Sequence, residues 1–271
     1  MPDKETVSGF GLVIIGNEIL DGRVQDSHFV TLRDLLKTRH HDFRYAQTLP
    51  DIPEIIDAQL RWCMSCDEPF FCCGGIGTTP DDHTRHCAAR VNGVGLELHP
   101  EGVRILEEKF GARATDTRMR LVDFPAGADL IPNPYNQVPG FRIGRGHYLP
   151  GFPEMATPMM EWVLDQWFQP GAEKFACKLV LPGAREADLV EIMESFIAAH
   201  PGLSFSSLPR FVDGGTEVHL GISGSEADVQ AGTDALTTLL TQSGVPFQTP
   251  AGTGNPSIDA SDRASTSSGR S

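Results

Sequence analysis

Three apolar, β-rich runs separated by helix-spaced patterns constrain the fold of this chain more than any other feature. The first run, residues 9–15, is continuously apolar, as is typical of strands buried on both faces of a parallel sheet. Two further short runs at residues 43–48 and 69–73 predict the second and third strands. This β-α-β-α-β order predicts an α/β unit whose mostly parallel sheet is covered on both faces.

The remaining elements divide the chain into two candidate domains and two tails. In the first domain we expect helices over residues 28–36, 53–60, 84–91, 100–110 and 153–168, and short strands over 128–131, 140–143 and 147–149. After a boundary at residues 169–171, a strand (175–181), a helix (186–200), two strands (204–208 and 216–223) and a helix (226–243) form a small βαββα module. The predicted organisation is a tail over 1–8, an α/β domain over 9–170, a small α+β domain over 172–248 and a disordered tail over 249–271.

The charge balance restricts the classes of partner. With 22 Lys and Arg against 36 Asp and Glu, the net charge is −14, which argues against nucleic acid and anionic membrane surfaces. The apolar run Phe10–Ile15 is far shorter than the roughly 20 residues that a membrane-spanning helix needs. The acidic N-terminus does not resemble a secretion signal. Six cysteines in 271 residues predict no disulfide scaffold, so we expect a reduced, cytoplasmic protein.

A glycine-rich stretch after the third predicted strand is the strongest candidate for a binding site. It reads Gly-Gly-x-Gly-Thr-Thr-x-x-Asp-x-Thr over residues 74–84 and leads into a predicted helix. Glycines allow the backbone to approach a ligand and to turn successive N–H groups toward an anion. The hydroxyls of Thr78, Thr79 and Thr84 and the helix N-terminus add further donors. The loop therefore predicts a phosphate or diphosphate ligand, although neither the Walker spacing nor the dinucleotide spacing is present.

Three acidic residues lie in loops that should reach the same edge of the sheet. Asp26, Asp51 and Asp82 follow the first, second and third predicted strands. Such carboxylates could bind ligand N–H and hydroxyl groups, hold a divalent ion, or activate water. Each acid could instead cap a helix, as could Ser27 before the first predicted helix.

Five stretches carry a resemblance to the molybdopterin-binding (MoCF, MogA/MoaB-like) domain, in the version that begins the CinA (competence/damage-inducible) proteins. Together they cover about residues 8–168. The small βαββα module also resembles the KH-like domain that follows in CinA proteins. The matching stretches are residues 16–26, 49–51, 73–84, 133–141 and 149–155.

This resemblance implies a three-layer α/β/α fold and a pocket for a molybdopterin or a nucleotide. It implies acids at Asp51 and Asp82 that are needed for activity and that could hold Mg, Mn or Co, because CinA-type domains are associated with metal-dependent cleavage of ADP-ribose-like diphosphates. It also makes a homo-oligomer plausible, whereas the amidase domain of CinA proteins has no counterpart in the sequence. By position, the pocket should be lined by Gly74, Gly75, Gly77, Thr78, Thr79 and Asp82, with Pro150, Gly151 and Glu154 forming another wall.

Four positions depart from the usual CinA pattern. Asn17 stands where Asp is usual, which removes one possible metal ligand, although Glu18 remains nearby. His28 replaces an Asn, and Cys72-Cys73 replaces two Thr. The change at Asn17 weakens the expectation of a metal-dependent hydrolase without excluding it, because Glu18, Asp26, Asp51 and Asp82 remain.

Three functions therefore stay open at this point. The first is a metal-dependent hydrolase of a nucleotide diphosphate, and the second is a binder of a molybdopterin phosphate that performs no hydrolysis. The third is a non-catalytic interaction protein. The pairs Cys63/Cys66 and His83/His86 have spacings seen in metal or redox sites, but packing and surface positions are the commoner explanations.

Overall fold

The computed structural model describes residues 4–249, which form two compact units that divide between Ala172 and Glu173. The predicted boundary at residues 169–171 lies directly before this division. The expected N-terminal tail is tied to the first unit, because Glu5 forms a parallel bridge with Phe168. The expected disordered tail, apart from Thr249, lies outside the described residues.

A six-stranded sheet forms the centre of the first unit, with the strand order β2-β1-β3-β8-β7-β6. Strands β1, β2, β3 and β8 are parallel, and β7 is antiparallel to both of its neighbours, which confirms the mostly parallel sheet. The strands are β1 (Gly9–Ile15), β2 (Asp42–Leu49), β3 (Phe70–Cys73), β6 (Asp129–Ile131), β7 (Gly140–Ile143) and β8 (Gly146–Leu149).

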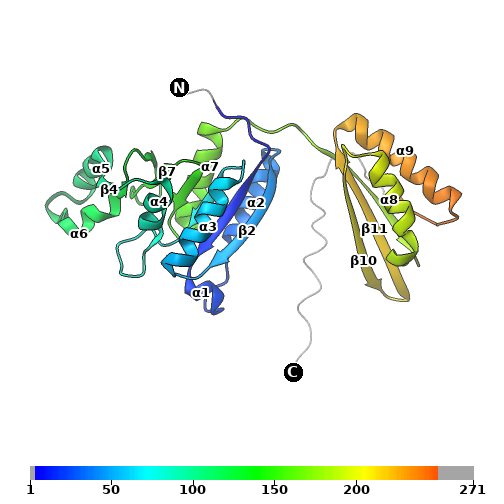
Figure 1. Cartoon of the computed structure of the whole chain (residues 1–271), viewed down its shortest axis with the longest axis horizontal. Coiled ribbons are helices and arrows are strands. Elements are labelled where there is room, and N and C mark those ends of the chain that lie inside the picture. Colours follow the sequence, from blue (N-terminus) through cyan, green and yellow to red (C-terminus); the bar gives the residue numbers. More distant parts are fainter. Residues whose placement is uncertain (1–3, 250–271) are drawn as a thin grey trace. The chain divides into compact units, whose positions relative to one another are not determined.

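Helices cover both faces of this sheet, as the continuous apolar run of β1 predicted (Figure 1). Phe10, Leu12 and Ile14 point to a core shared with α2 (His28–Thr38) and α7 (Pro153–Trp167). Val13 and Ile15 point to the opposite core, which contains side chains of α3 (Pro53–Ser65) and α4 (Thr84–Asn92). The first unit is therefore a three-layer α/β/α domain, and its parallel strands end at one common edge.

The segment between α4 and β6 contains structure that the sequence did not predict. Only α5 (Pro100–Phe110) matches an expected helix there. Three-residue strands and single helical turns are too short to show a hydrophobic period, so no pattern indicated them. The additional elements are α1 (Asn17–Leu20) after β1, and, in this segment, β4 (Leu96–Leu98), η1 (Gly111–Arg113), α6 (Asp116–Met119), η2 (Arg120–Val122) and β5 (Asp123–Pro125).

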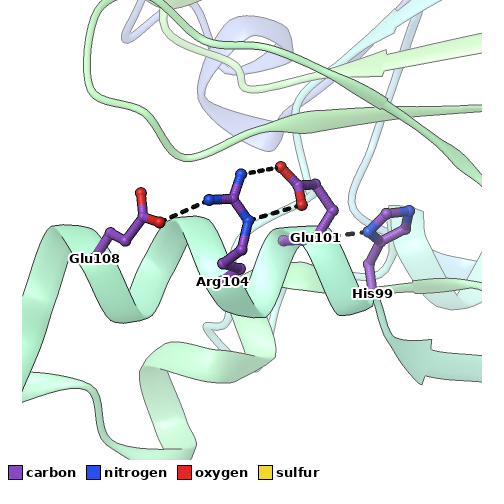
Figure 2. Close-up of polar contacts among 5 residues, drawn as sticks. His99, Glu101, Arg104 and Glu108 are labelled. Atoms are coloured by element: carbon purple, nitrogen blue, oxygen red, sulfur yellow. Dashed lines mark hydrogen bonds and ion pairs between the residues drawn. The ribbon is translucent and has the colours of Figure 1, made fainter.

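Helix α5 carries a network of exposed ion pairs, shown in Figure 2. Arg104 donates to both carboxylate oxygens of Glu101, at 2.9 and 2.5 Å, and to Glu108 at 2.7 Å. At the start of the helix, His99 Nδ1 accepts a hydrogen bond from the Gly102 N–H at 3.2 Å. These contacts lie along one helix and in solvent, so they support α5 locally.

The second unit has the predicted βαββα order. Its antiparallel sheet has the strand order β10-β11-β9, and Cys177, Leu179 and Leu181 of β9 contribute to a core with α8 and α9. The helix expected over residues 186–200 begins as a 3-10 turn. The KH-like resemblance of this unit stays a prediction. The elements are β9 (Phe175–Pro182), η3 (Glu186–Leu189), α8 (Val190–Ala199), β10 (Ser204–Val212), β11 (Gly215–Gly224) and α9 (Glu226–Gln242).

Within residues 4–249, none of the helices has both the length and the apolar character that crossing a bilayer requires.

Candidate functional site

A cleft of about 830 Å³ lies where β1, β2, β3 and β8 end. The segments that follow these four strands all contribute to its walls, as expected for the carboxyl edge of an open α/β sheet. The residues that line it are Ile15, Gly16, Glu18, Val24, Asp51, Gly74, Gly75, Ile76, Gly77, Thr78, Thr79, Asp81, Asp82, Leu121, Asn133, Asn136, Val138, Pro139, Pro150, Gly151, Phe152, Pro153, Glu154 and Met155.

The glycine loop after β3 has a backbone path that depends on its glycines. Gly74 and Gly75 have φ angles of +105° and +67°. A Cβ atom on Gly74 would lie 2.1 Å from the Ile15 carbonyl oxygen, and one on Gly75 would lie 2.3 Å from Thr84 Oγ1. Gly151 of the β8 loop makes a less severe approach, since its Cβ would lie 3.3 Å from Gly74 Cα. The missing side chains let the loop pass close to the end of β1 and to Thr84, and let the β8 loop approach Gly74.

The first two residues of α4 hold three carbonyl groups of this loop. Thr84 Oγ1 donates to the Gly74 carbonyl at 2.9 Å, and the Thr84 N–H donates to the Gly75 carbonyl at 3.0 Å. Arg85 Nη2 donates to the Gly77 carbonyl at 2.6 Å. The loop is thus fixed from the side of α4 by buried residues.

These bonds also set the direction of the loop's N–H groups. No cis peptide occurs among residues 4–249, so each N–H points opposite to the carbonyl of the preceding residue. The N–H groups of Gly75, Ile76 and Thr78 therefore point away from the start of α4. In the described part of the chain, the N–H groups of Gly75, Ile76, Gly77 and Thr78 donate to no other residue. Consecutive free donors of this kind form a cradle for an anion.

Two of the three predicted acids line the cleft. Asp51 Oδ2 accepts a hydrogen bond from the Asn17 N–H at 2.8 Å, which ties α1 to the loop after β2. Asp82 Oδ2 accepts from the N–H of Thr79 at 2.8 Å and from its hydroxyl at 2.6 Å. Both carboxylates therefore order their loops, and both remain at the surface of the cleft.

Asp26 has a different position. It does not line the cleft, and its carboxylate accepts hydrogen bonds from the N–H groups of His28 and Phe29 and contacts His28 Nδ1 at 2.7 Å. Asp26 thus caps α2, whereas the expected cap, Ser27, makes no side-chain capping bond. Of the three acids that could have capped a helix, Asp26 is one that does so.

Some of the other predicted residues line the cleft, whereas Thr84 supports the glycine loop from behind it. Thr78 and Thr79 line the cleft, as do Pro150, Gly151 and Glu154 from the segment after β8. Thr84 is fully buried and does not line it, because its hydroxyl is bonded to the loop.

Several residues of the site were missed by sequence reasoning. Arg85 is 4% exposed and bonds to the loop. Its burial could not be inferred from the sequence, because charged residues in helices are usually exposed. Asn133 and Asn136 form part of the cleft wall and bond to each other at 2.9 Å. They lie in the stretch 133–141, whose resemblance to the family could have placed them at the site. Phe152 lines the cleft although 63% of it is exposed.

A divalent ion at the cleft stays a prediction. Across residues 4–249, no three side chains of His, Cys, Asp or Glu come together as a metal site. Cys63 and Cys66 are free thiols, and burial raises the pKa of Cys63 above its ordinary value. His83 and His86 do not line the cleft.

Comparisons with known proteins agree on one family. A family model described as "Probable molybdopterin binding domain" matches residues 11–169, more than half of the chain. A protein of Pyrobaculum arsenaticum is 30% identical over 239 residues, which cover 83% of this chain and 90% of that protein. A CinA-like protein of Citrifermentans bemidjiense is 32% identical over 226 residues, 79% of this chain and 53% of the relative.

Another CinA-like protein, from Anaeromyxobacter sp., is 35% identical over 188 residues, 66% of this chain and 44% of the relative. The chain thus spans about half the length of these CinA-like relatives. The crystal structure of the protein CinA, of unknown function, from Thermoplasma acidophilum superposes with a TM-score of 0.54 at 22% identity. It covers 59% of this chain and 99% of that one, and it shows the same fold. The chain belongs to the molybdopterin-binding (MoCF) domain family and is CinA-like.

Proposed function

We propose that the cleft binds the phosphate group of a small molecule through the N–H groups of the glycine loop, with molybdopterin as the first candidate. The observation that carries this proposal is the set of four consecutive free N–H groups from Gly75 to Thr78 at the wall of the cleft. A cleft of about 830 Å³ lies within the range of about 300–1,000 Å³ typical of cofactor and small-molecule sites. The family description supports a pterin.

The remaining walls suit a ligand that is larger than phosphate. Apolar groups from Ile76, Leu121, Val138 and Phe152 line the cleft together with the amides of Asn133 and Asn136. Apolar walls with a few polar groups are typical of sites that bind a flat ring and fix its orientation. A phosphorylated pterin and a nucleotide both have this combination of an anionic end and a ring.

Calorimetric titration tests the binding proposal. The ligands are inorganic pyrophosphate, molybdopterin and ADP-ribose, and the variant is Thr78→Glu, which places a carboxylate at the cradle. The control is Thr238→Glu, which makes the same charge change on an exposed position of α9. We expect Thr78→Glu to lose binding of every phosphorylated ligand and Thr238→Glu to keep it. Equal binding by the wild type and Thr78→Glu would contradict the proposal.

A second candidate function is hydrolysis of a nucleotide diphosphate such as ADP-ribose. It is favoured by Asp82, whose Oδ2 is fixed by Thr79 while Oδ1 has no hydrogen-bond partner among the described residues. An oriented carboxylate with one free oxygen beside a diphosphate cradle could accept a proton from an attacking water. Asp51 is the second candidate for this role, because it lines the same cleft.

Mass analysis of the products separates hydrolysis from binding. The protein is incubated with ADP-ribose, with Mg, Mn or Co and without a divalent ion, because the cleft side chains alone form no metal site. If the protein is a hydrolase, Asp82→Asn will keep the fold and lose turnover. If Asp82→Asn keeps turnover, Asp82 is not the base, and absence of product in every condition leaves the binding function.

A further inference from the structure

Arg85 is a buried charge with an unusual set of partners. Its guanidinium donates to three backbone carbonyls: Gly77 at 2.6 Å, Arg120 at 2.7 Å and Asp123 at 2.9 Å. Its hydrogen bonds within residues 4–249 go to these backbone carbonyls and to no carboxylate, and its Nε is buried without a hydrogen-bond partner. A buried arginine that is bonded to carbonyls retains its positive charge without a carboxylate in contact.

The three carbonyls belong to two different segments that contribute to the cleft. Gly77 lies in the glycine loop, whereas Arg120 and Asp123 flank a segment whose Leu121 also lines the cleft. Arg85 thus joins the loop to the η2–β5 segment through one side chain. Because Arg85 holds the Gly77 carbonyl, it also determines where the Thr78 N–H points.

Thr84 and Arg85 divide the orientation of the loop between them. Thr84 holds the carbonyls of Gly74 and Gly75 and therefore orients the N–H groups of Gly75 and Ile76. Only Arg85 holds the Gly77 carbonyl among the described residues. Loss of Arg85 should release the Thr78 N–H and leave the Gly75 N–H in place.

We propose that Arg85 is the positioning residue of the anion cradle: it aims the Thr78 N–H at the bound anion and places a buried positive charge directly behind the loop. This inference rests on the proposed phosphate binding. A preorganised donor with a fixed positive charge behind it binds an anion more strongly than a mobile donor, because no ordering is needed on binding.

The orientation is tested on the full chain without any ligand, by 15N relaxation of the loop amides in Arg85→Met and Thr84→Val. The Thr78 amide should have an order parameter near 0.85 in the wild type and below about 0.6 in Arg85→Met, while the Gly75 amide stays rigid. Thr84→Val should show the reverse pattern, because it removes the bond to the Gly74 carbonyl. A rigid Thr78 in Arg85→Met, or equal loosening of both amides in both variants, would overturn the proposal.

The effect on binding is measured by titration with inorganic pyrophosphate. We expect Arg85→Met to bind about tenfold more weakly, which corresponds to about 1.4 kcal/mol. Arg85→Lys should recover part of this loss, because an ammonium can bond the Gly77 carbonyl but cannot span all three. If Arg85→Met does not fold, the test uses Arg85→Lys instead. In that variant the order parameter of the Thr78 amide should lie between the rigid and the mobile value. Unchanged affinity in the folded variant contradicts the proposal.

These measurements separate the two claims. A wild-type protein that does not bind pyrophosphate contradicts the proposed function, whereas the relaxation data need no ligand and judge the orienting role of Arg85 by themselves.

Discussion

Gly74 occupies a position that a residue with a side chain cannot take without moving its surroundings. Its φ of +105° is outside the range that other residues adopt readily, and the missing Cβ makes room for the backbone of β1. At this residue the requirements of the fold and of the cleft coincide, because the same turn brings the loop to the ends of β1 and β8.

Gly74→Ala should therefore lower the free energy of unfolding more than the same substitution at a glycine that has a positive φ but open space around it. The control is Gly93→Ala, where φ is +70° but nothing lies within 4 Å of the added Cβ, so we expect a cost of about 1–2 kcal/mol there. At Gly74 the contact with the Ile15 carbonyl adds to the backbone strain. Urea unfolding gives both free energies, and equal costs would show that the loop relaxes around the new methyl group.

His147 makes the stability of the fold dependent on pH. Its side chain is fully buried in β8, and burial lowers its pKa to about 3, with a smaller contribution from Arg142. The unfolded chain binds a proton at about pH 6.5, so it binds more protons than the folded state between pH 6.5 and 3. The free energy of unfolding therefore decreases as the pH falls through this window, because protonation favours the unfolded chain.

Between pH 7 and pH 5 this linkage amounts to about 2 kcal/mol. We expect urea unfolding of the wild type to show this decrease in the free energy of unfolding. In His147→Leu, which has no group that titrates at this position, the decrease between pH 7 and pH 5 should be about 2 kcal/mol smaller. The same pH dependence in both proteins would show that His147 becomes protonated without unfolding.

At the scale of elements, α4 determines the site more than any other helix, because its first two residues hold the loop. The β-α-β-α-β order and the mostly parallel sheet could be predicted, since long apolar runs and helical spacing depend on local sequence. The glycine loop could be placed at the strand end for the same reason. The burial of Arg85 could not be predicted, and the sequence left open which of the three acids caps a helix, because both depend on which carbonyl or N–H groups the fold brings near the side chain.

Two arginines on neighbouring helices should differ in what they contribute. Arg85 of α4 is buried and bonds three carbonyls, whereas Arg104 of α5 is 59% exposed and bonds two exposed glutamates (Figure 2). Arg85→Met leaves buried carbonyls without a donor and should cost at least about 2 kcal/mol. Arg104→Ala should leave the midpoint of urea unfolding unchanged. A larger effect at Arg104 than at Arg85 would contradict this ranking.

At the scale of the whole molecule, the cleft belongs to one unit. Every residue that lines it, and both cores beside the six-stranded sheet, precede the division at Ala172, while the third core lies entirely after it. A domain with its own core is expected to fold alone.

A fragment of residues 1–172 should therefore unfold cooperatively and bind pyrophosphate with the affinity of the full chain. Circular dichroism during urea unfolding and calorimetric titration check the two parts. A fragment that folds but does not bind would show that the second unit contributes to the site.

If the N–H groups of the glycine loop bind an anion, chemical-shift mapping in a pyrophosphate titration will detect it at the binding atoms themselves. We expect the amide signals of Gly75, Ile76, Gly77 and Thr78 to move downfield together and saturate, while those of the second unit stay in place. Shifts confined to other residues, or no saturable shift in the loop, would contradict it.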